Sequence, residues 1–155
     1  MKKCVQCENG SYAKNIVTNY KYLTPMGVVI IEGKSHFLKC EKCEHLVITG
    51  ETYQKWNLLI LKSLTEKSGA LNAKDLQFIL SVLPYQQKEI AEAMGKNKST
   101  LTYYKNGKNP IDPLFDYAIR DVIRDFLVGG NETLTRLQAT FKFEGETTIK
   151  KVKAN

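Results

Sequence analysis

The chain has 155 residues, of which 43% are hydrophobic and 25% charged, and its formal net charge is +7 at pH 7. This composition predicts a globular protein of one or two small domains and excludes a disordered chain. The N-terminal MKKCVQCENG has lysines but no apolar segment behind them, and no run approaches about eighteen apolar residues, so neither a secretory signal nor a membrane span is expected. We therefore expect a cytoplasmic protein.

Four cysteines form two C-x-x-C pairs, CVQC (Cys4, Cys7) and CEKC (Cys40, Cys43). Each such turn places two sulfurs on one edge of a tetrahedron, and two turns supply the four thiolates that Zn²⁺ prefers. A four-cysteine shell has no open position for water or substrate, so we predict one structural zinc ion. A redox dithiol or unliganded cysteines are the alternatives.

The segment between the cysteine pairs predicts a small sheet. Three runs rich in β-branched and aromatic residues, at 15–23, 27–33 and 36–40, are bounded by proline and glycine. We expect a three-stranded zinc ribbon. His36 and His45 flank the second cysteine pair and are alternative metal ligands, but we expect them to be packing or surface residues.

A helix follows the ribbon. Thr49 is a candidate N-cap for a helix from about 51 to 66, in which Trp56 belongs to an apolar face and is expected in the core. The segment EKSGALN (66–72) mixes charge, serine and glycine and is the best candidate linker. We therefore divide the chain into a zinc-ribbon domain (1–69), a helical domain (70–130) and a C-terminal region (131–155).

The helical domain is predicted to hold four helices. They are AKDLQFILSVL before Pro84, QQKEIAEAM before Gly95, KSTLTYYKN before Gly107, and a longer helix that starts at Pro113 and runs to about Val128. The two middle helices have the pattern of a helix-turn-helix. Apolar residues give each an inner face, and Gly95 permits the tight turn between them.

The stretch QKEIAEAMGKNKSTLTYYKNGKNP resembles the XRE-type helix-turn-helix of phage repressors, over about residues 73–128. The resemblance implies that the second helix enters the major groove of double-stranded DNA, where serine, threonine and tyrosine contact base edges and lysines neutralise phosphates. The candidate DNA contacts are Gln87, Lys96, Asn97, Lys98, Ser99, Thr100, Thr102, Tyr103, Lys105 and Lys108. The alternative is a helical hairpin whose lysines only keep it soluble.

The residue pattern of the C-terminal region differs from that of the helical domain. LQATFKF alternates apolar and polar residues, and Glu144 and Gly145 favour a turn after it. TTIKKVK would then form the returning strand, which predicts a β-hairpin. A basic tail with Lys150, Lys151 and Lys153 is the alternative. The predicted fold class is α+β, with an N-terminal zinc ribbon, an all-α helix-turn-helix domain and this C-terminal β-hairpin.

The order of a C-x-x-C…C-x-x-C ribbon, a helix, a linker and an XRE-type domain resembles the MqsA family of antitoxins (YgiT-type zinc finger), over about residues 1–128. The resemblance implies that the four cysteines bind zinc, that the N-terminal domain binds and blocks a ribonuclease toxin, and that the C-terminal domain dimerises and represses the operon. The family's base-reading amide and arginine fall on Ser99 and Tyr103, so a different operator is expected.

We therefore expect a homodimeric repressor that binds a palindromic operator and serves as the antitoxin of a type II toxin-antitoxin system. A stand-alone phage- or plasmid-type regulator without a toxin is the alternative. The helix at 113–128 has an apolar stripe wider than one packing contact requires, which favours a dimer unless all of it packs within the chain.

Two other functions are less well supported. The two histidines both lie near a cysteine pair, and the sequence offers no set of nucleophile, base and orienting group, so an enzyme is not expected. Ten lysines and six acids from Met1 to Gly69 give the ribbon a net charge of +4, and it contains tyrosines for base stacking, so RNA binding is an alternative. These aromatics are more often strand core.

Overall fold

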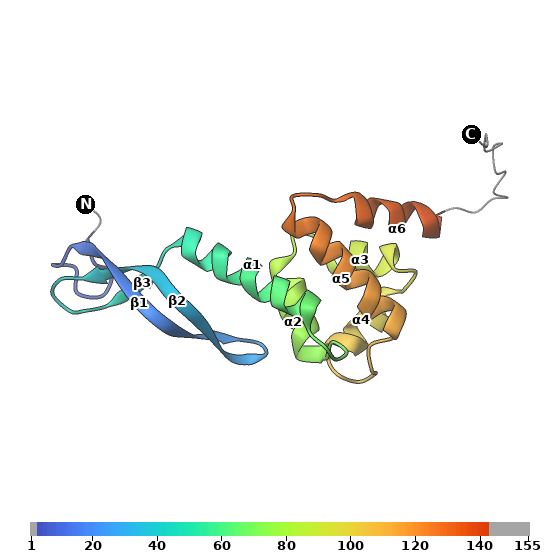
Figure 1. The fold of residues 1–155 in the computed structure, drawn as a ribbon, viewed down its shortest axis with the longest axis horizontal. Helices are drawn as coiled ribbons and strands as arrows, with labels where there is room; N and C mark the ends of the chain where they lie inside the picture. The colour runs from blue at the N-terminus through green and yellow to red at the C-terminus, as the bar shows by residue number, and fades with distance from the viewer. Residues whose placement is uncertain (1–2, 143–155) are drawn as a thin grey trace.

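The computed structural model describes residues 3–142, which form a small β-sheet followed by six helices (Figure 1). The elements are β1 (Tyr12–Thr24), β2 (Gly27–Cys40), β3 (Leu46–Ile48), α1 (Gly50–Glu66), α2 (Ala73–Val82), α3 (Gln87–Ala93), α4 (Lys98–Lys105), α5 (Pro113–Leu127) and α6 (Glu132–Lys142). The predicted α+β class with a three-stranded antiparallel sheet at the N-terminus is confirmed.

The sheet is built on one long hairpin. β1 and β2 pair antiparallel along their length, and β3 adds three residues beside the end of β2. A bulge interrupts the pairing near Asn19 (φ 52°), whose Oδ1 accepts a hydrogen bond from the N–H of Gly33 at 3.2 Å. Because the bulge accommodates Gly33 without ending the pairing of the two strands, β2 continues past Gly33. The predicted break at Gly33 was therefore wrong, and the third strand follows the second cysteine pair.

Helix α1 covers one face of the sheet. Thr49 caps it as predicted, by accepting a hydrogen bond from the N–H of Thr52. Trp56 is 3% exposed, and its ring stacks on Tyr20 with centroids 5.1 Å apart. Its Nε1–H donates to Ser35 Oγ at 3.2 Å, which satisfies the only polar atom of the side chain. The expected core position of Trp56 is confirmed.

The segment between α1 and α2, predicted as a linker, is tied to α5. Arg120 forms an ion pair with Asp116 (Nε–Oδ1 2.6 Å) and donates to the carbonyls of Lys67 (2.7 Å) and Gly69 (2.6 Å). Asp116 also accepts from the N–H of Leu71 at 3.0 Å. These bonds fix the C-terminal end of α1 against α5. The division of the chain near residue 69 stays a prediction.

Helices α2 to α5 begin where the sequence predicted. Asn72 caps α2 and forms a capping box with Asp75, and Asp112 caps α5 with Pro113 in the first turn. The bundle core is fully buried. It contains Leu76, Ile79, Ile90, Ala91, Leu101, Phe115, Ile119 and Ile123.

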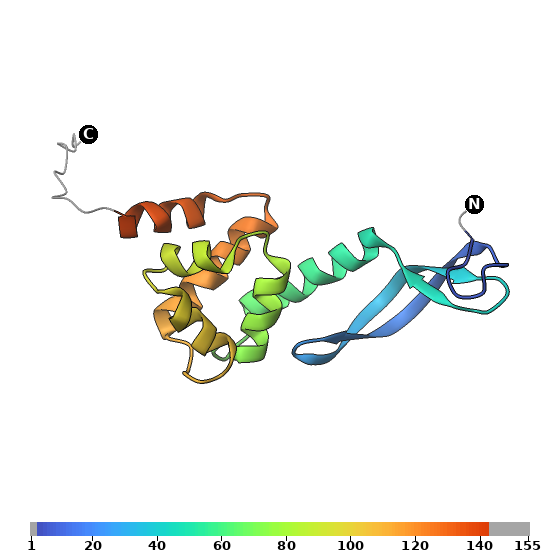
Figure 2. The ribbon, with the colours of Figure 1, turned by 180° about the vertical axis from the view of Figure 1, so that it is seen from behind.

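The last described element corrects the sequence prediction. Residues 132–142 form helix α6, which packs against α3 and α5, so the predicted strand LQATFKF is wrong over this range (Figures 1 and 2). Leu134 is 5% exposed, and Leu137, one helical turn later, packs on the same core. The N–H of Thr133 donates to Asp125 Oδ2 at 2.9 Å at the helix start. The burial of Leu134 and Leu137 along one helical face thus outweighs the alternation of apolar and polar residues that predicted a strand.

The rest of the predicted hairpin, including Glu144, Gly145, Lys150, Lys151 and Lys153, lies outside the described residues. Within residues 3–142, no helix combines the length and apolar character that crossing a membrane requires.

Candidate metal centre and DNA-contacting surface

The four cysteines converge as predicted. One sulfur from each of Cys4, Cys7, Cys40 and Cys43 lies within 4.8 Å of all the others. The Sγ–Sγ distance is 3.6 Å between Cys4 and Cys43 and 3.7 Å between Cys7 and Cys40. A tetrahedral ion with Zn–S bonds of about 2.3 Å requires sulfur–sulfur edges of about 3.8 Å. The cluster therefore fits one structural metal ion.

Both C-x-x-C segments are turns of the same geometry. The residue after each pair, Glu8 or Glu44, has a left-handed backbone (φ 56° and 61°), and its N–H donates to the carbonyl of the pair's first cysteine at 2.9 and 3.1 Å. The N–H groups of Gln6 and Lys42 each point at the sulfur of that same cysteine at 3.4 Å. Such N–H donors stabilise thiolates and fix their orientation toward a metal.

Gly10 completes the centre, and sequence reasoning missed it. A Cβ added there would overlap the sulfur of Cys40 and lie 3.2 Å from the sulfur of Cys7. The carbonyl of Gly10 accepts the N–H of Cys4 at 2.8 Å. The position therefore requires glycine for close approach of the backbone to the sulfurs. Its place in an Asn-Gly pair just before β1 is the sequence signal that could have indicated it.

The electrostatics of the cluster also suit a cation. The Tyr12 hydroxyl beside Cys4 lowers the pKa of that thiol to about 5, although burial raises it. At Cys43 the backbone of His45 lowers the pKa, but burial and the neighbouring cysteines raise it to about 12. The thiol of Cys4 therefore loses its proton readily, whereas the negative charge of the cluster opposes deprotonation of Cys43. A divalent cation would neutralise this negative charge.

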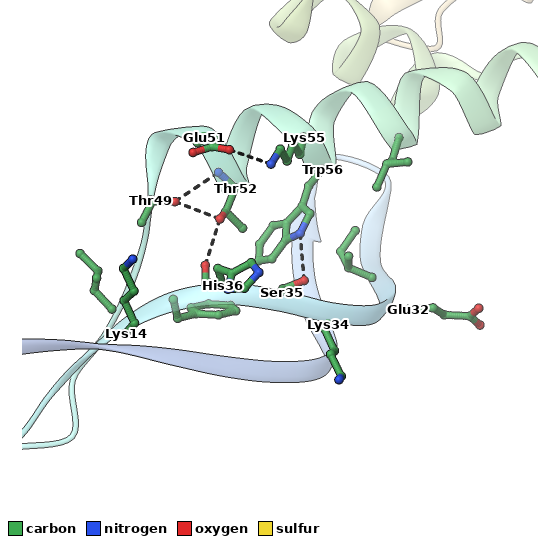
Figure 3. A pocket seen from close by; sticks show the side chains of 14 residues that line it. Lys14, Glu32, Lys34, Ser35, His36, Thr49, Glu51, Thr52, Lys55 and Trp56 are labelled. Carbon is green, nitrogen blue, oxygen red and sulfur yellow. Dashed lines mark hydrogen bonds and ion pairs between the residues drawn. The ribbon is translucent and has the colours of Figure 1, made fainter.

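Neither histidine belongs to the cysteine cluster of the described residues. His45 Nδ1 lies 3.3 Å from the Tyr12 hydroxyl, which also accepts the N–H of Val5 at 3.3 Å. His36 lies on β2, near the first turn of α1 (Figure 3).

Helices α3 and α4 are joined by a tight turn. Gly95 has φ 61°, and the N–H of Lys96 reaches back to the carbonyl of Ala91 at 2.8 Å. Leu101 is 1% exposed and Tyr104 is 6% exposed, as the predicted inner face of α4 requires. The ring of Tyr104 packs edge-on against Phe115 with centroids 5.3 Å apart, which fixes α4 on α5.

The outer face of α4 carries part of the predicted contact set. At 100° per residue, Ser99, Thr102 and Tyr103 lie opposite the buried side, with Lys98 and Thr100 on its flanks. Ser99, Lys98 and Tyr103 are exposed, whereas Thr100 and Thr102 are half-buried. The hydroxyl of Thr102 donates to the carbonyl of Lys98 at 2.9 Å.

The other predicted contacts are arranged around this face. Lys108 Nζ lies 5.5 Å from the centroid of the Tyr103 ring, and Lys105 Nζ lies 3.4 Å from Gln87 Oε1. Two of the candidates have structural partners instead. Lys96 forms an ion pair with Asp112 (2.5 Å) across the start of α5, and Asn97 caps α4 by accepting from the N–H of Thr100 at 2.7 Å.

A comparison of the chain with protein-family models and with curated proteins finds no match in either set. The geometry above is therefore the basis of the functional argument.

Proposed function

We propose that this protein is a sequence-specific double-stranded DNA-binding regulator, a repressor that places α4 in the major groove. The observation that carries the proposal is the outer face of α4, where hydroxyl groups and one tyrosine ring are surrounded by lysines. The segment from Gly95 to Lys108 contains four lysines and no acid. An α-helix with its side chains is about 10–12 Å across, which suits a major groove about 12 Å wide.

We propose a division of roles within this surface. Ser99, Thr102 and Tyr103 face outward and are the proposed base contacts, whereas Lys98, Lys105 and Lys108 are the proposed phosphate contacts. Gln87 begins α3 beside Lys105 and is the proposed amide contact to the backbone. Lys96, Asn97 and Thr100 support α4 from its N-terminal end, and their contribution to DNA affinity is proposed to be indirect.

The experiment compares binding of the full chain to its own promoter DNA and to a scrambled duplex over a salt series. We expect preference for the promoter and an affinity that falls steeply with salt. Tyr103→Ala should cost about 1–3 kcal/mol on the promoter only, and Lys108→Ala should weaken binding to both duplexes. Lys88→Ala, on the exposed side of α3, is the matched control. Weak and equal binding to both duplexes would contradict the proposal.

A homodimer is proposed through the exposed part of α5. Most of the predicted apolar stripe is buried within the chain, but Leu114 is 80% exposed and Tyr117 is 67% exposed. These two side chains lie about one helical turn apart on one face. A twofold dimer would read a palindrome with half-sites about 34 Å apart. Leu114→Glu should shift the protein to a monomer in analytical ultracentrifugation and reduce operator affinity.

The antitoxin role is a second candidate, favoured by an exposed apolar sheet face. Ile16, Leu23, Val28 and Ile30 are between 53% and 76% exposed on the face of the β1–β2 hairpin that α1 does not cover. Such a face suits a protein partner. The net charge of the ribbon is positive, so a toxin would have to present acidic residues to it. Co-purification of the chain with the product of its neighbouring gene tests this role, and a solitary gene would favour the stand-alone regulator.

A further inference from the structure

The side of helix α5 that faces away from the core carries a regular row of exposed and half-exposed side chains. Their spacing alternates between three and four residues, which is the heptad spacing of a helix that packs against another helix. At about 100° per residue, these positions fall within an arc of about 80°, opposite the buried positions of the helix. We call them the α5 seam, which consists of Leu114, Tyr117, Asp121, Arg124 and Val128.

Both ends of the seam are apolar. Leu114 is 80% exposed and Tyr117 67% exposed at one end, and Val128 is 83% exposed at the other. The apolar surface continues past the second end, because Leu127 lines an apolar groove together with Leu58 and Leu59 of α1. A contiguous apolar surface of this kind indicates contact with another protein.

The centre of the seam is charged. Arg124 Nη1 and Asp121 Oδ1 form an ion pair at 2.6 Å, and Arg124 Nη2 also donates to the carbonyl of Thr65 at 3.2 Å. Within residues 3–142, Asp121 Oδ2 has no hydrogen-bond partner. A guanidinium has five N–H donors, so Arg124 also has donors to spare. The pair can therefore accept a second pair of opposite charges.

The charges determine how a second copy of α5 fits the seam. In a parallel arrangement Asp121 would face its own equivalent, and so would Arg124, which places like charges together. In an antiparallel arrangement with the twofold axis between Asp121 and Arg124, each Asp121 faces the partner's Arg124. The same register places Tyr117 against the partner's Val128. A shift by one heptad would instead place Asp121 against the partner's Tyr117, which leaves a covered charge without its partner.

We propose that α5 packs antiparallel against α5 of a second copy of this chain, in the register in which Asp121 faces the partner's Arg124. This inference rests on the homodimer proposed above and specifies its geometry. The apolar ends supply most of the affinity, and the four central charges fix the direction and the register of the two helices.

Sedimentation velocity of the full chain without DNA tests the seam. Asp121→Arg and Arg124→Asp each place like charges opposite each other twice per dimer, and each should raise the dimer dissociation constant at least about tenfold. An equimolar mixture of the two variants restores opposite charges across the axis, so it should form a heterodimer with an affinity within about threefold of the unaltered homodimer. The two variants differ in mass, so native mass spectrometry identifies the heterodimer. Repulsion within each chain is the same alone and in the mixture, so recovery on mixing reports the contact between copies.

Two further variants locate the surface. Val128→Glu should prevent dimerisation, and its side chain is exposed, so the thermal melt of the chain should persist. Leu23→Glu is the matched control, because Leu23 is 76% exposed on the sheet, and it should leave dimerisation unchanged.

Three results would overturn the proposal: an unaltered chain that is monomeric, a mixture that stays as monomeric as its separate components, or a dimer that is lost in Leu23→Glu but kept in Val128→Glu. Promoter binding is measured on the same samples. A monomer that still prefers the promoter would contradict only the seam, whereas a dimer without that preference would contradict only the proposed DNA binding.

Discussion

Replacing Arg120 with methionine should destabilise the fold, because it breaks an ion pair that is nearly buried. Arg120 pairs with Asp116 and donates to the carbonyls of Lys67 and Gly69. Both side chains of the ion pair are nearly buried, at 12% and 13% exposure. Methionine keeps much of the aliphatic stem but leaves the carboxylate with one remaining donor, the N–H of Leu71.

The magnitude follows from this burial. Removing one partner of a buried ion pair costs about 3–5 kcal/mol, because the other charge is left uncompensated. The lower end applies here, since the carbonyl of Gly69 lies in an exposed segment and can bond to water instead. We therefore expect a loss of about 3 kcal/mol in the free energy of unfolding, which corresponds to a fall in Tm of about 6–12 °C for a domain of this size.

Urea denaturation, followed by circular dichroism and by Trp56 fluorescence, measures this loss. Arg124→Met is the matched control. Arg124 also reaches the carbonyl of Thr65, but its ion pair with Asp121 is half-exposed, at 51% and 36%. It should cost less than about 1 kcal/mol. Equal, small costs for the two variants would refute the view that the Arg120 pair holds α1 to α5.

The other predictions concern the metal centre and the start of α5. Gly10→Ala should destabilise the metal-bound protein by about 1–3 kcal/mol, since its Cβ would overlap a cysteine sulfur; Gly69→Ala, where a Cβ meets nothing within 4 Å, should be neutral in the same melt. A strong chelator should unfold the sheet while the α2–α5 helices persist, seen as a red shift of tryptophan emission with most helical circular dichroism retained, and an unchanged emission would contradict a structural metal. The ammonium of Lys96 lowers the pKa of Asp112, so this pair stabilises the fold above the unfolded pKa of about 3.9 and loses that effect as the pH falls through the lower folded value. Lys96→Met should therefore cost up to about 1 kcal/mol at pH 7 and nothing once the pH lies well below the folded pKa of Asp112, and a cost that is independent of pH would show that the lysine acts through packing instead.

Much of the helical part could be predicted because its signals are local. Thr49, Asn72 and Asp112 stand where N–H groups need a cap, and glycines follow the ends of helices α4 and α5. The convergence of the cysteines was likewise predictable, since C-x-x-C spacing itself forms the turn. Each helix cap and each C-x-x-C turn depends on residues within about one turn of chain.

The features that were missed depend on distant partners. Whether residues 132–142 form a strand or a helix is decided by the burial of Leu134 on the bundle. The continuity of β2 depends on a bulge around Asn19 in the opposite strand. The role of Gly10 depends on a sulfur thirty residues later, and the anchoring of the 67–71 segment depends on Arg120 in α5. Apart from the Asn-Gly pair that contains Gly10, none of these pairings has a local sequence signal.

Helix α1 belongs to both halves of the molecule. Its first half is fixed to the sheet through Trp56, and its last turn is fixed to α5 through Arg120. The sheet therefore has a fixed orientation about the α1 axis relative to the other helices of the bundle. One residue inserted into the middle of α1 would turn the sheet by about 100° about the helix axis and move it by about 1.5 Å. Seven inserted residues would restore its direction to within about 20° at a distance about 10 Å greater. The length of α1, counted in residues, therefore sets which way the apolar face of the ribbon points relative to α4, the helix proposed to contact DNA.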